Sequence, residues 1–129
     1  MKTHSILVLG GTGLLGLPTT TQLVDDGFEV RLLARNPERA RRMVPSTVEI
    51  VPGDVADPAA VARAMEGCDS VHISVGGQVD QVSAEHVAAG AADAGVNHIT
   101  YLSGATVADG NAWFPMVEQK LRAEEALAA

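Results

Sequence analysis

Three glycines near the start of the chain have the spacing of a phosphate-binding turn. Gly10, Gly13 and Gly16 directly follow the apolar run 5–9 and precede a helical pattern. Glycines so placed permit a tight turn, the approach of a pyrophosphate to the backbone and its contact with the N–H groups of a helix start. We therefore predict a dinucleotide site, the alternative being a glycine turn that binds nothing. The residues predicted to contact the cofactor here are Gly10, Thr12, Gly13, Leu14 and Gly16.

The residues after the second expected strand indicate which dinucleotide is bound. Sites selective for NAD place an acid there to accept from the ribose hydroxyls, whereas this chain has Arg35 followed by Asn36. A guanidinium would attract a 2′-phosphate, and Arg39 or Arg31 could add to the field. We predict NADP(H) over NAD(H), with Arg35 and Asn36 as contacts, unless these arginines are only solvated helix surface.

Further candidates stand at the carboxyl ends of strands, where ligands bind in open α/β sheets. Asp54 follows the third expected strand; its carboxylate could accept from an adenine amino group, or could equally close a turn on its own backbone. Ser74 and Gly76 end the fourth expected strand, where glycine would let the backbone approach the ribose or the nicotinamide. We predict cofactor contacts at Asp54, Ser74 and Gly76.

Alternating apolar runs and helical patterns predict the elements that position these residues. Strands are expected at 5–9, 28–34, 48–51, 70–75 and 98–102. Helices are expected at 14–26, 37–43, 58–66, 82–94 and 114–128. Connections of this length require right-handed crossovers between parallel strands. The predicted fold class is α/β, a doubly wound parallel sheet of Rossmann type with about five strands in the order 3-2-1-4-5.

Composition and charge exclude several classes of protein. The 129 residues are 47% hydrophobic but only 3% aromatic, which predicts a single core of aliphatic side chains. The formal net charge of −7 argues against general binding to nucleic acid or anionic lipid. The apolar runs are too short to cross a bilayer, and we expect residues 1–4 to lead into the first strand and not to belong to a signal peptide.

Cysteine and histidine usage predicts a reducing compartment and no metal site. Cys68 is the only cysteine, which rules out an internal disulfide and fits a cytoplasmic protein. We expect it to be a small packing residue without chemistry. The histidines, at positions 4, 72, 86 and 98, lack the spacing of metal ligands.

Taken together, these motifs resemble those of the NmrA-like NAD(P)H-binding branch of the atypical short-chain dehydrogenase/reductase superfamily. The resemblance spans nearly the whole chain, and its carriers are the segments 10–16, 33–37, 51–55, 92–103 and 118–127. Family members typically continue well beyond this length and add a substrate-binding lobe. The resemblance implies that residues 1–129 form the NAD(P)-binding Rossmann domain, with the C-terminal substrate lobe absent.

The resemblance also bears on catalysis. Catalytic members of the wider superfamily use a Tyr-x-x-x-Lys pair, in which the lysine lowers the tyrosine pKa and holds the ribose. Lys120 fits the lysine position, but Met116 stands four residues before it and cannot exchange a proton. Ser103 or Thr106 could fill the position of the helper hydroxyl, unless Gly104 aligns there. The catalytic candidates implied are Lys120 and Ser103.

Two aromatic residues complete the set of candidates. Tyr101, the only tyrosine, lies within the fifth expected strand and not at the superfamily position. Trp113 is expected to begin the last helix, where it would pack in the core or an interface, or line the nicotinamide pocket.

Three functions follow from these expectations. The first is an NADP(H)-dependent oxidoreductase acting on quinone-like or small carbonyl acceptors, because members of the branch that lack the tyrosine include enzymes that reduce quinones by direct hydride transfer. The second, motivated by Met116, is a noncatalytic NADP(H)-binding redox sensor. The third is a fragment of a larger enzyme, whose uncovered strand edge would favour a homo-oligomer. The partners expected are the nucleotide cofactor and a small molecule of unknown identity.

Overall fold

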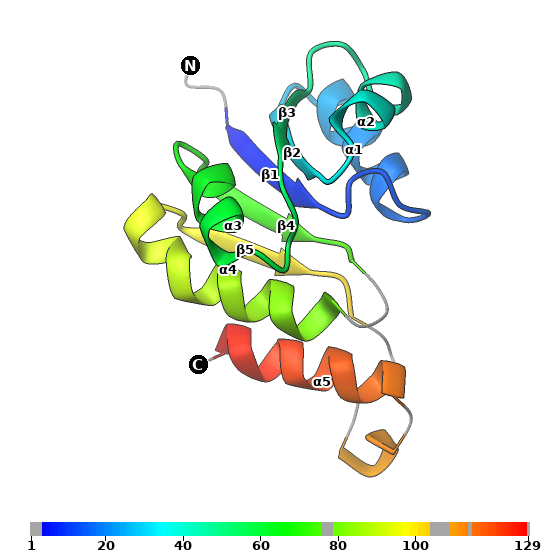
Figure 1. Cartoon of the computed structure of the whole chain (residues 1–129), viewed down its shortest axis with the longest axis vertical. Helices are drawn as coiled ribbons and strands as arrows, with labels where there is room; N and C mark the ends of the chain where they lie inside the picture. Colours follow the sequence, from blue (N-terminus) through cyan, green and yellow to red (C-terminus); the bar gives the residue numbers. More distant parts are fainter. Residues whose placement is uncertain (1–3, 76–78, 104–108, 114, 129) are drawn as a thin grey trace.

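The computed structural model describes residues 4–75, 79–103, 109–113 and 115–128 (Figure 1). In this part of the chain the strands are β1 (Ser5–Leu9), β2 (Glu29–Ala34), β3 (Glu49–Pro52), β4 (Ser70–Ile73) and β5 (His98–Tyr101). The helices are α1 (Gly16–Asp25), α2 (Pro37–Met43), α3 (Pro58–Met65), α4 (Asp80–Ala94) and α5 (Pro115–Ala128), with a short 3₁₀ helix, η2, at Asp109–Asn111.

The described strands form a parallel sheet in the order β3-β2-β1-β4-β5, which confirms the predicted fold class. β1 is central: Leu7 is in register with Arg31 of β2 on one side and with Val71 of β4 on the other. The chain therefore winds away from β1 in one direction and then in the other. Because all strands are parallel, their carboxyl ends meet at one edge, and a ligand crevice is expected beside β1 where the direction reverses.

Local signals in the sequence set where two of the helices begin. The side-chain oxygen of Asn36 accepts from the N–H of Arg39 at 3.1 Å and caps α2. Asp57 caps α3 in the same way, through the N–H of Ala59 at 3.0 Å. A proline follows each cap, at a position where no intrahelical hydrogen bond is lost.

Some boundaries differ from the sequence prediction by one or two residues. α1 begins at Gly16 because the glycine turn continues through Leu15. α4 begins at Asp80, before the first residue of its apolar pattern. α5 begins at Pro115, and the predicted start, Phe114, lies outside the described residues. Apolar periodicity locates the middle of an element, whereas hydrogen bonding sets its ends.

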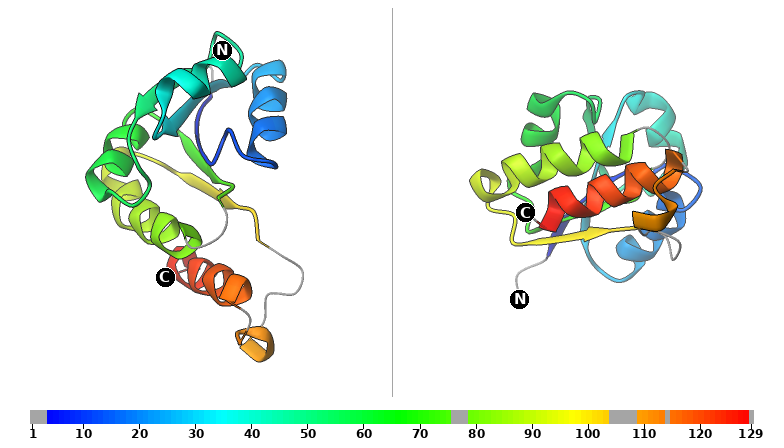
Figure 2. Two further views of the ribbon diagram at one scale, coloured as in Figure 1. Left: turned by 45° about the vertical axis from the view of Figure 1, so that its right-hand side comes forward. Right: turned by 90° about the horizontal axis from the view of Figure 1, so that it is seen from below.

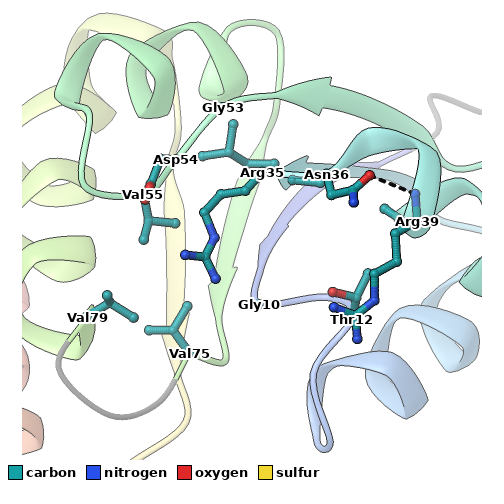
Figure 3. A pocket seen from close by; sticks show the side chains of 13 residues that line it. Gly10, Thr12, Arg35, Asn36, Arg39, Gly53, Asp54, Val55, Val75 and Val79 are labelled. Carbon is teal, nitrogen blue, oxygen red and sulfur yellow. Dashed lines mark hydrogen bonds between the residues drawn. The ribbon is translucent and has the colours of Figure 1, made fainter.

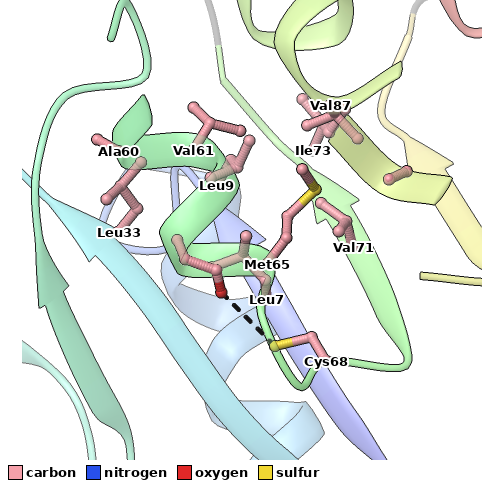
Figure 4. Packing of buried hydrophobic residues seen from close by; sticks show 12 residues of the cluster. Leu7, Leu9, Leu33, Ala60, Val61, Met65, Cys68, Val71, Ile73 and Val87 are labelled. Carbon is pink, nitrogen blue, oxygen red and sulfur yellow. Dashed lines mark hydrogen bonds between the residues drawn. The ribbon is translucent and has the colours of Figure 1, made fainter. Parts of the chain in front are cut away.

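Helices cover both faces of the sheet (Figure 2). Each face has its own core. The first core, beneath α3 and α4, includes Leu7, Leu9, Met65, Val71 and Val87 (Figure 4). The second core, beneath α1 and the end of α2, includes Val8, Val30, Leu32, Val44 and Val48. Successive residues of β1 thus alternate between two apolar interiors, as expected of a strand covered on both faces.

The edge strand β5 is covered on one face only. Ile99 and Tyr101 pack against the first core, whereas His98 and Thr100 point to the other face and are exposed. Thr100 Oγ1 lies 2.6 Å from Nδ1 of His72 on β4. α5 packs along α4, and the amino ends of both helices lie on the side to which β4 and β5 point (Figure 1).

Candidate functional site

The glycine turn between β1 and α1 lies against the carboxyl end of β4. Gly10 has a φ of +80°, a left-handed conformation that favours glycine, and a Cβ there would overlap the carbonyl oxygen of Ser74. A Cβ on Gly16 would overlap the carbonyl oxygen of Gly10. Backbone contacts therefore require both glycines, and they hold the start of α1 close to the ends of β1 and β4.

Backbone hydrogen bonds close this turn. The N–H of Gly13 donates to the Gly10 oxygen at 3.1 Å, and the N–H of Leu17 donates to the Gly13 oxygen at 2.9 Å. The Leu14 side chain is 92% exposed, so the cofactor contact predicted there would come from its backbone N–H. The Leu17 N–H is thus used and Pro18 has none, so the N–H groups without an acceptor among the described residues here are those of Leu14, Leu15 and Gly16.

Thr20 of α1, which the sequence analysis did not single out, supports the turn from behind. It is fully buried, and its hydroxyl donates to the carbonyl oxygen of Gly11 at 3.1 Å. A Cβ on Gly11 would lie 2.9 Å from that hydroxyl and would overlap the side chain of Leu32. The sequence carried no signal for this contact, because a threonine within a helix does not identify its acceptor.

A pocket of about 260 Å³ opens beside the glycine turn (Figure 3). Its walls come from the turn, the end of β2 with α2, the loop after β3 and the segment after β4. The described residues that line it are Gly10, Thr12, Leu33, Ala34, Arg35, Asn36, Arg39, Ala40, Gly53, Asp54, Val55, Val75 and Val79. Five of the residues predicted from sequence therefore lie around one pocket: Gly10, Thr12, Arg35, Asn36 and Asp54.

Two arginines give this pocket its positive charge. The Arg35 side chain extends into the pocket from the end of β2, and Arg39 lines it from the first turn of α2 (Figure 3). Within the described part of the chain, neither guanidinium forms an ion pair. Two unpaired cations on a concave surface favour an anionic ligand.

Asn36 and Asp54 each combine a local structural contact with a place on the pocket. The Asn36 oxygen caps α2, and Asp54 Oδ1 accepts from the N–H of Ala56 at 3.0 Å. The turn that the sequence allowed for Asp54 is thus present. The second oxygen of Asp54 and the amide nitrogen of Asn36 make no hydrogen bond within the described residues.

Arg31 lies elsewhere, although the sequence places it close to Arg35. Its guanidinium pairs with Glu49 at 2.5 Å and donates to the carbonyl oxygens of Ala64 and Glu66, away from the pocket at the end of β2. The suggestion that Arg31 adds to the phosphate field is therefore wrong.

Lys120, the catalytic candidate on α5, is held by Asp80 and by the end of β5. Its Nζ donates to Asp80 Oδ1 at 3.0 Å and to the Leu102 oxygen at 3.3 Å, and lies 5.4 Å from the centre of the Tyr101 ring. The Tyr101 hydroxyl donates to the same Asp80 oxygen at 2.6 Å. Burial and this hydrogen bond raise the pKa of Tyr101 well above its ordinary value. Tyr101 is thus beside Lys120, but its hydroxyl is a poor acid at neutral pH.

The two predicted serines lie at the carboxyl ends of β4 and β5. Ser74 adjoins Gly10, and Ser103 follows β5. Both hydroxyls are buried without a hydrogen-bond partner in the described part of the chain. Gly76 lies outside the described residues, so its predicted contact stays a prediction.

Met116 and Trp113 stand near the start of α5. Met116, at the position of the superfamily tyrosine, is half exposed. Trp113 precedes α5 and does not begin it, and its side chain is 80% exposed. Trp113 therefore does not pack in the core, because most of its side chain is exposed, and the interface or the nicotinamide pocket stays the prediction for it.

Cys68 packs in the first core, with Sγ 3.7 Å from the Ala64 oxygen (Figure 4). This burial confirms the predicted packing role, and it raises the pKa of the Cys68 thiol. Among the residues described, no three His, Cys, Asp or Glu side chains come together as a metal site requires. None of the described helices has the length and apolar character to span a membrane.

The sequence matches those of known NAD(P)H-binding proteins. The sequence profile of a family described as NAD(P)H-binding matches residues 10–129. The chain is 44% identical over 98 residues to (4-alkanoyl-5-oxo-2,5-dihydrofuran-3-yl)methyl phosphate reductase of Streptomyces griseus. The aligned segment covers 76% of this chain and 34% of that protein. It is 32% identical over 77 residues to an NmrA-like family domain-containing protein of Dictyostelium discoideum, and this aligned segment covers 57% of this chain and 26% of that protein.

A solved structure gives the same assignment. Triphenylmethane reductase of Citrobacter sp., in complex with NADP(H), superposes with a TM-score of 0.78 at 28% identity, over 96% of this chain and 45% of that one. The chain thus spans less than half the length of each of these relatives. The NmrA-like resemblance is confirmed. Because its profile matches nearly the whole sequence, this protein belongs to the NAD(P)H-binding family, which includes reductases.

Proposed function

We propose that residues 1–129 form the cofactor-binding domain of a reductase and that this domain prefers NADP(H) to NAD(H). The observation that carries the proposal is the pair of arginines, Arg35 and Arg39, on one pocket at the end of β2. NAD-selective sites hold an acid at the position of Arg35. A 2′-phosphate bound here would receive charge-assisted hydrogen bonds from the guanidinium groups, while the ribose hydroxyls of NADH would gain little from them.

The remaining walls of the pocket fit the rest of the adenosine half. Gly10 and Thr12 place the pyrophosphate at the start of α1, where unpaired N–H groups and the helix dipole stabilise its charge. Val55 and Val79 offer apolar surface for the adenine ring. The second oxygen of Asp54 has no partner among the described residues, and we assign it to the adenine amino group.

When bound, NADPH supplies a hydride. The chain places no acid where the superfamily has its tyrosine, because Met116 carries no exchangeable proton and the Tyr101 hydroxyl donates to Asp80. We propose quinone-like or small carbonyl acceptors, which take the hydride from NADPH and a proton from water, leaving NADP⁺ and the reduced acceptor. The two reductases among the relatives support a reductive role.

A second function, a noncatalytic NADP(H)-binding redox sensor, is favoured by the same arrangement. Lys120 is engaged with Asp80 and Leu102, and Met116, which has no exchangeable proton, stands at the position of the superfamily tyrosine. Such a protein would bind both redox forms of the cofactor without oxidising NADPH.

An acceptor screen separates the two functions. The loss of NADPH absorbance is followed at saturating cofactor with quinone and small carbonyl acceptors, with the heat-unfolded chain as the control. We expect oxidation above that control with a quinone-like acceptor, and a faster rate with NADPH than with NADH. Cofactor binding without oxidation across the panel would contradict the reductase and support the sensor.

A further inference from the structure

Asp80, the first residue of α4, is a buried carboxylate that the sequence motifs do not explain. Its side chain is fully buried, and its Oδ1 accepts from both Lys120 Nζ at 3.0 Å and Tyr101 Oη at 2.6 Å. The Lys120 side chain is 15% exposed. A buried ion pair of this kind contributes little net stability compared with an apolar pair of the same volume. Stability alone is therefore a weak reason for its presence.

The pair lies next to the proposed cofactor pocket. Val79, which lines the pocket, immediately precedes Asp80. Lys120 reaches the same place from α5 and donates to the oxygen of Leu102, whose own N–H donates to Ile73 at the end of β4. The ammonium therefore lies at the carboxyl ends of β4 and β5, on the far side of the crevice from Arg35.

The two contacts of Lys120 fix its ammonium but use only two of its three hydrogen-bond donors. Of its three N–H donors, one is taken by Asp80 and one by Leu102. A lysine stem is flexible, and two anchoring contacts of the ammonium remove most of that freedom before a ligand arrives. The third donor has no acceptor among the described residues and is available to a ligand, since the side chain is 15% exposed.

The hydrogen bonds of Asp80 are also incomplete. Its Oδ2 is buried without a partner within the described residues, and so is the hydroxyl of Ser83 one turn later. Buried polar groups of a purely structural pair are normally satisfied, and an exception calls for an explanation. The incomplete set fits a carboxylate whose placement serves Lys120.

We propose that Asp80 is a positioning residue that holds the Lys120 ammonium at the nicotinamide end of the site, so that its third N–H reaches the ribose hydroxyls of that half. Tyr101 fixes the same carboxylate oxygen through its hydroxyl. This inference rests on the proposed binding of NADP(H). It separates the site into an adenosine half, held by Arg35 and the glycine turn, and a nicotinamide half held by Lys120.

Two probes tell these halves apart. Adenosine 2′,5′-bisphosphate carries only the adenosine half, whereas NADPH carries both. Each is titrated calorimetrically into the wild-type chain, Asp80→Asn, Lys120→Met and the double variant, with Asp93→Asn, an exposed acid on the same helix, as the matched control. Thermal unfolding of each variant reports its stability. The double variant has no unpaired buried charge, so it stays folded where a single variant loses stability.

We expect Asp80→Asn and Lys120→Met each to weaken NADPH binding by about tenfold and to change bisphosphate binding by less than about twofold. In the double variant, NADPH binding is expected to be no weaker than in Lys120→Met, because Asp80 acts through Lys120. If the variants weaken the binding of both probes equally, or leave NADPH binding unchanged, the inference is overturned while the NADP(H) assignment stays in place. If the wild-type chain does not bind the bisphosphate, the proposed function itself fails.

Discussion

Gly10→Ala is expected to weaken NADPH binding by about 100-fold or more, equivalent to roughly 2.7 kcal/mol. The added Cβ would overlap the carbonyl oxygen of Ser74, so the turn must move away from β4. That movement misaligns the N–H groups at the start of α1 with the pyrophosphate, and each lost charge-assisted hydrogen bond costs about 1.5–3 kcal/mol. Calorimetric titration with NADPH measures the loss, and urea unfolding measures the accompanying cost in stability.

Gly95→Ala is the matched control for this variant. Gly95 also has a φ of +80°, but a Cβ there meets nothing within 4 Å. Both variants carry the backbone strain, of about 1–2 kcal/mol, and only Gly10→Ala adds the overlap. We expect Gly95→Ala to bind NADPH as the unaltered chain does. Equal NADPH affinities of the two variants would show that the turn does not hold the pyrophosphate.

Arg35→Ala is expected to lower NADPH affinity by about 10- to 100-fold while leaving NADH affinity within about twofold. The guanidinium extends into the pocket without an ion pair in the described part of the chain, so its loss removes an attraction that only the 2′-phosphate uses. Paired titrations of the variant with NADPH and NADH, at low ionic strength to limit screening, measure the change in preference.

Arg42→Ala controls for the loss of one positive charge. Arg42 is exposed near the end of α2 and is not among the described residues that line the pocket. Its removal is expected to leave the preference for NADPH intact. A parallel loss of NADPH and NADH affinity in Arg35→Ala would contradict a 2′-phosphate contact and would indicate a general disturbance of the pocket.

The fold was predictable because its signals are local. The apolar run 5–9, the glycine spacing after it and the prolines that follow Asn36 and Asp57 each act over a few residues. Parallel connections then restrict the topology to the observed strand order. The pocket at the ends of β1, β2 and β3 follows from the same signals, since these strand ends must meet at one edge of the sheet.

The contacts that hold Lys120 were not predictable, because they join residues that are distant in the sequence. Lys120 and Asp80 are 40 positions apart, and the sequence does not show that α4 and α5 pack side by side. The positions of the Arg31 and Arg39 side chains could not be predicted for the same reason. Arg31, in the middle of β2, pairs with Glu49 of β3, whereas Arg39 lines the pocket because Asn36 caps the start of α2. Neither orientation is set by residue type.

Parallel calorimetric titration of the unaltered chain with NADPH and NADH tests the central claim most directly. The pocket with Arg35, Arg39 and the glycine turn predicts that both nucleotides bind and that NADPH binds tighter by about tenfold or more. Equal affinities, tighter binding of NADH, or no binding of either nucleotide would contradict it.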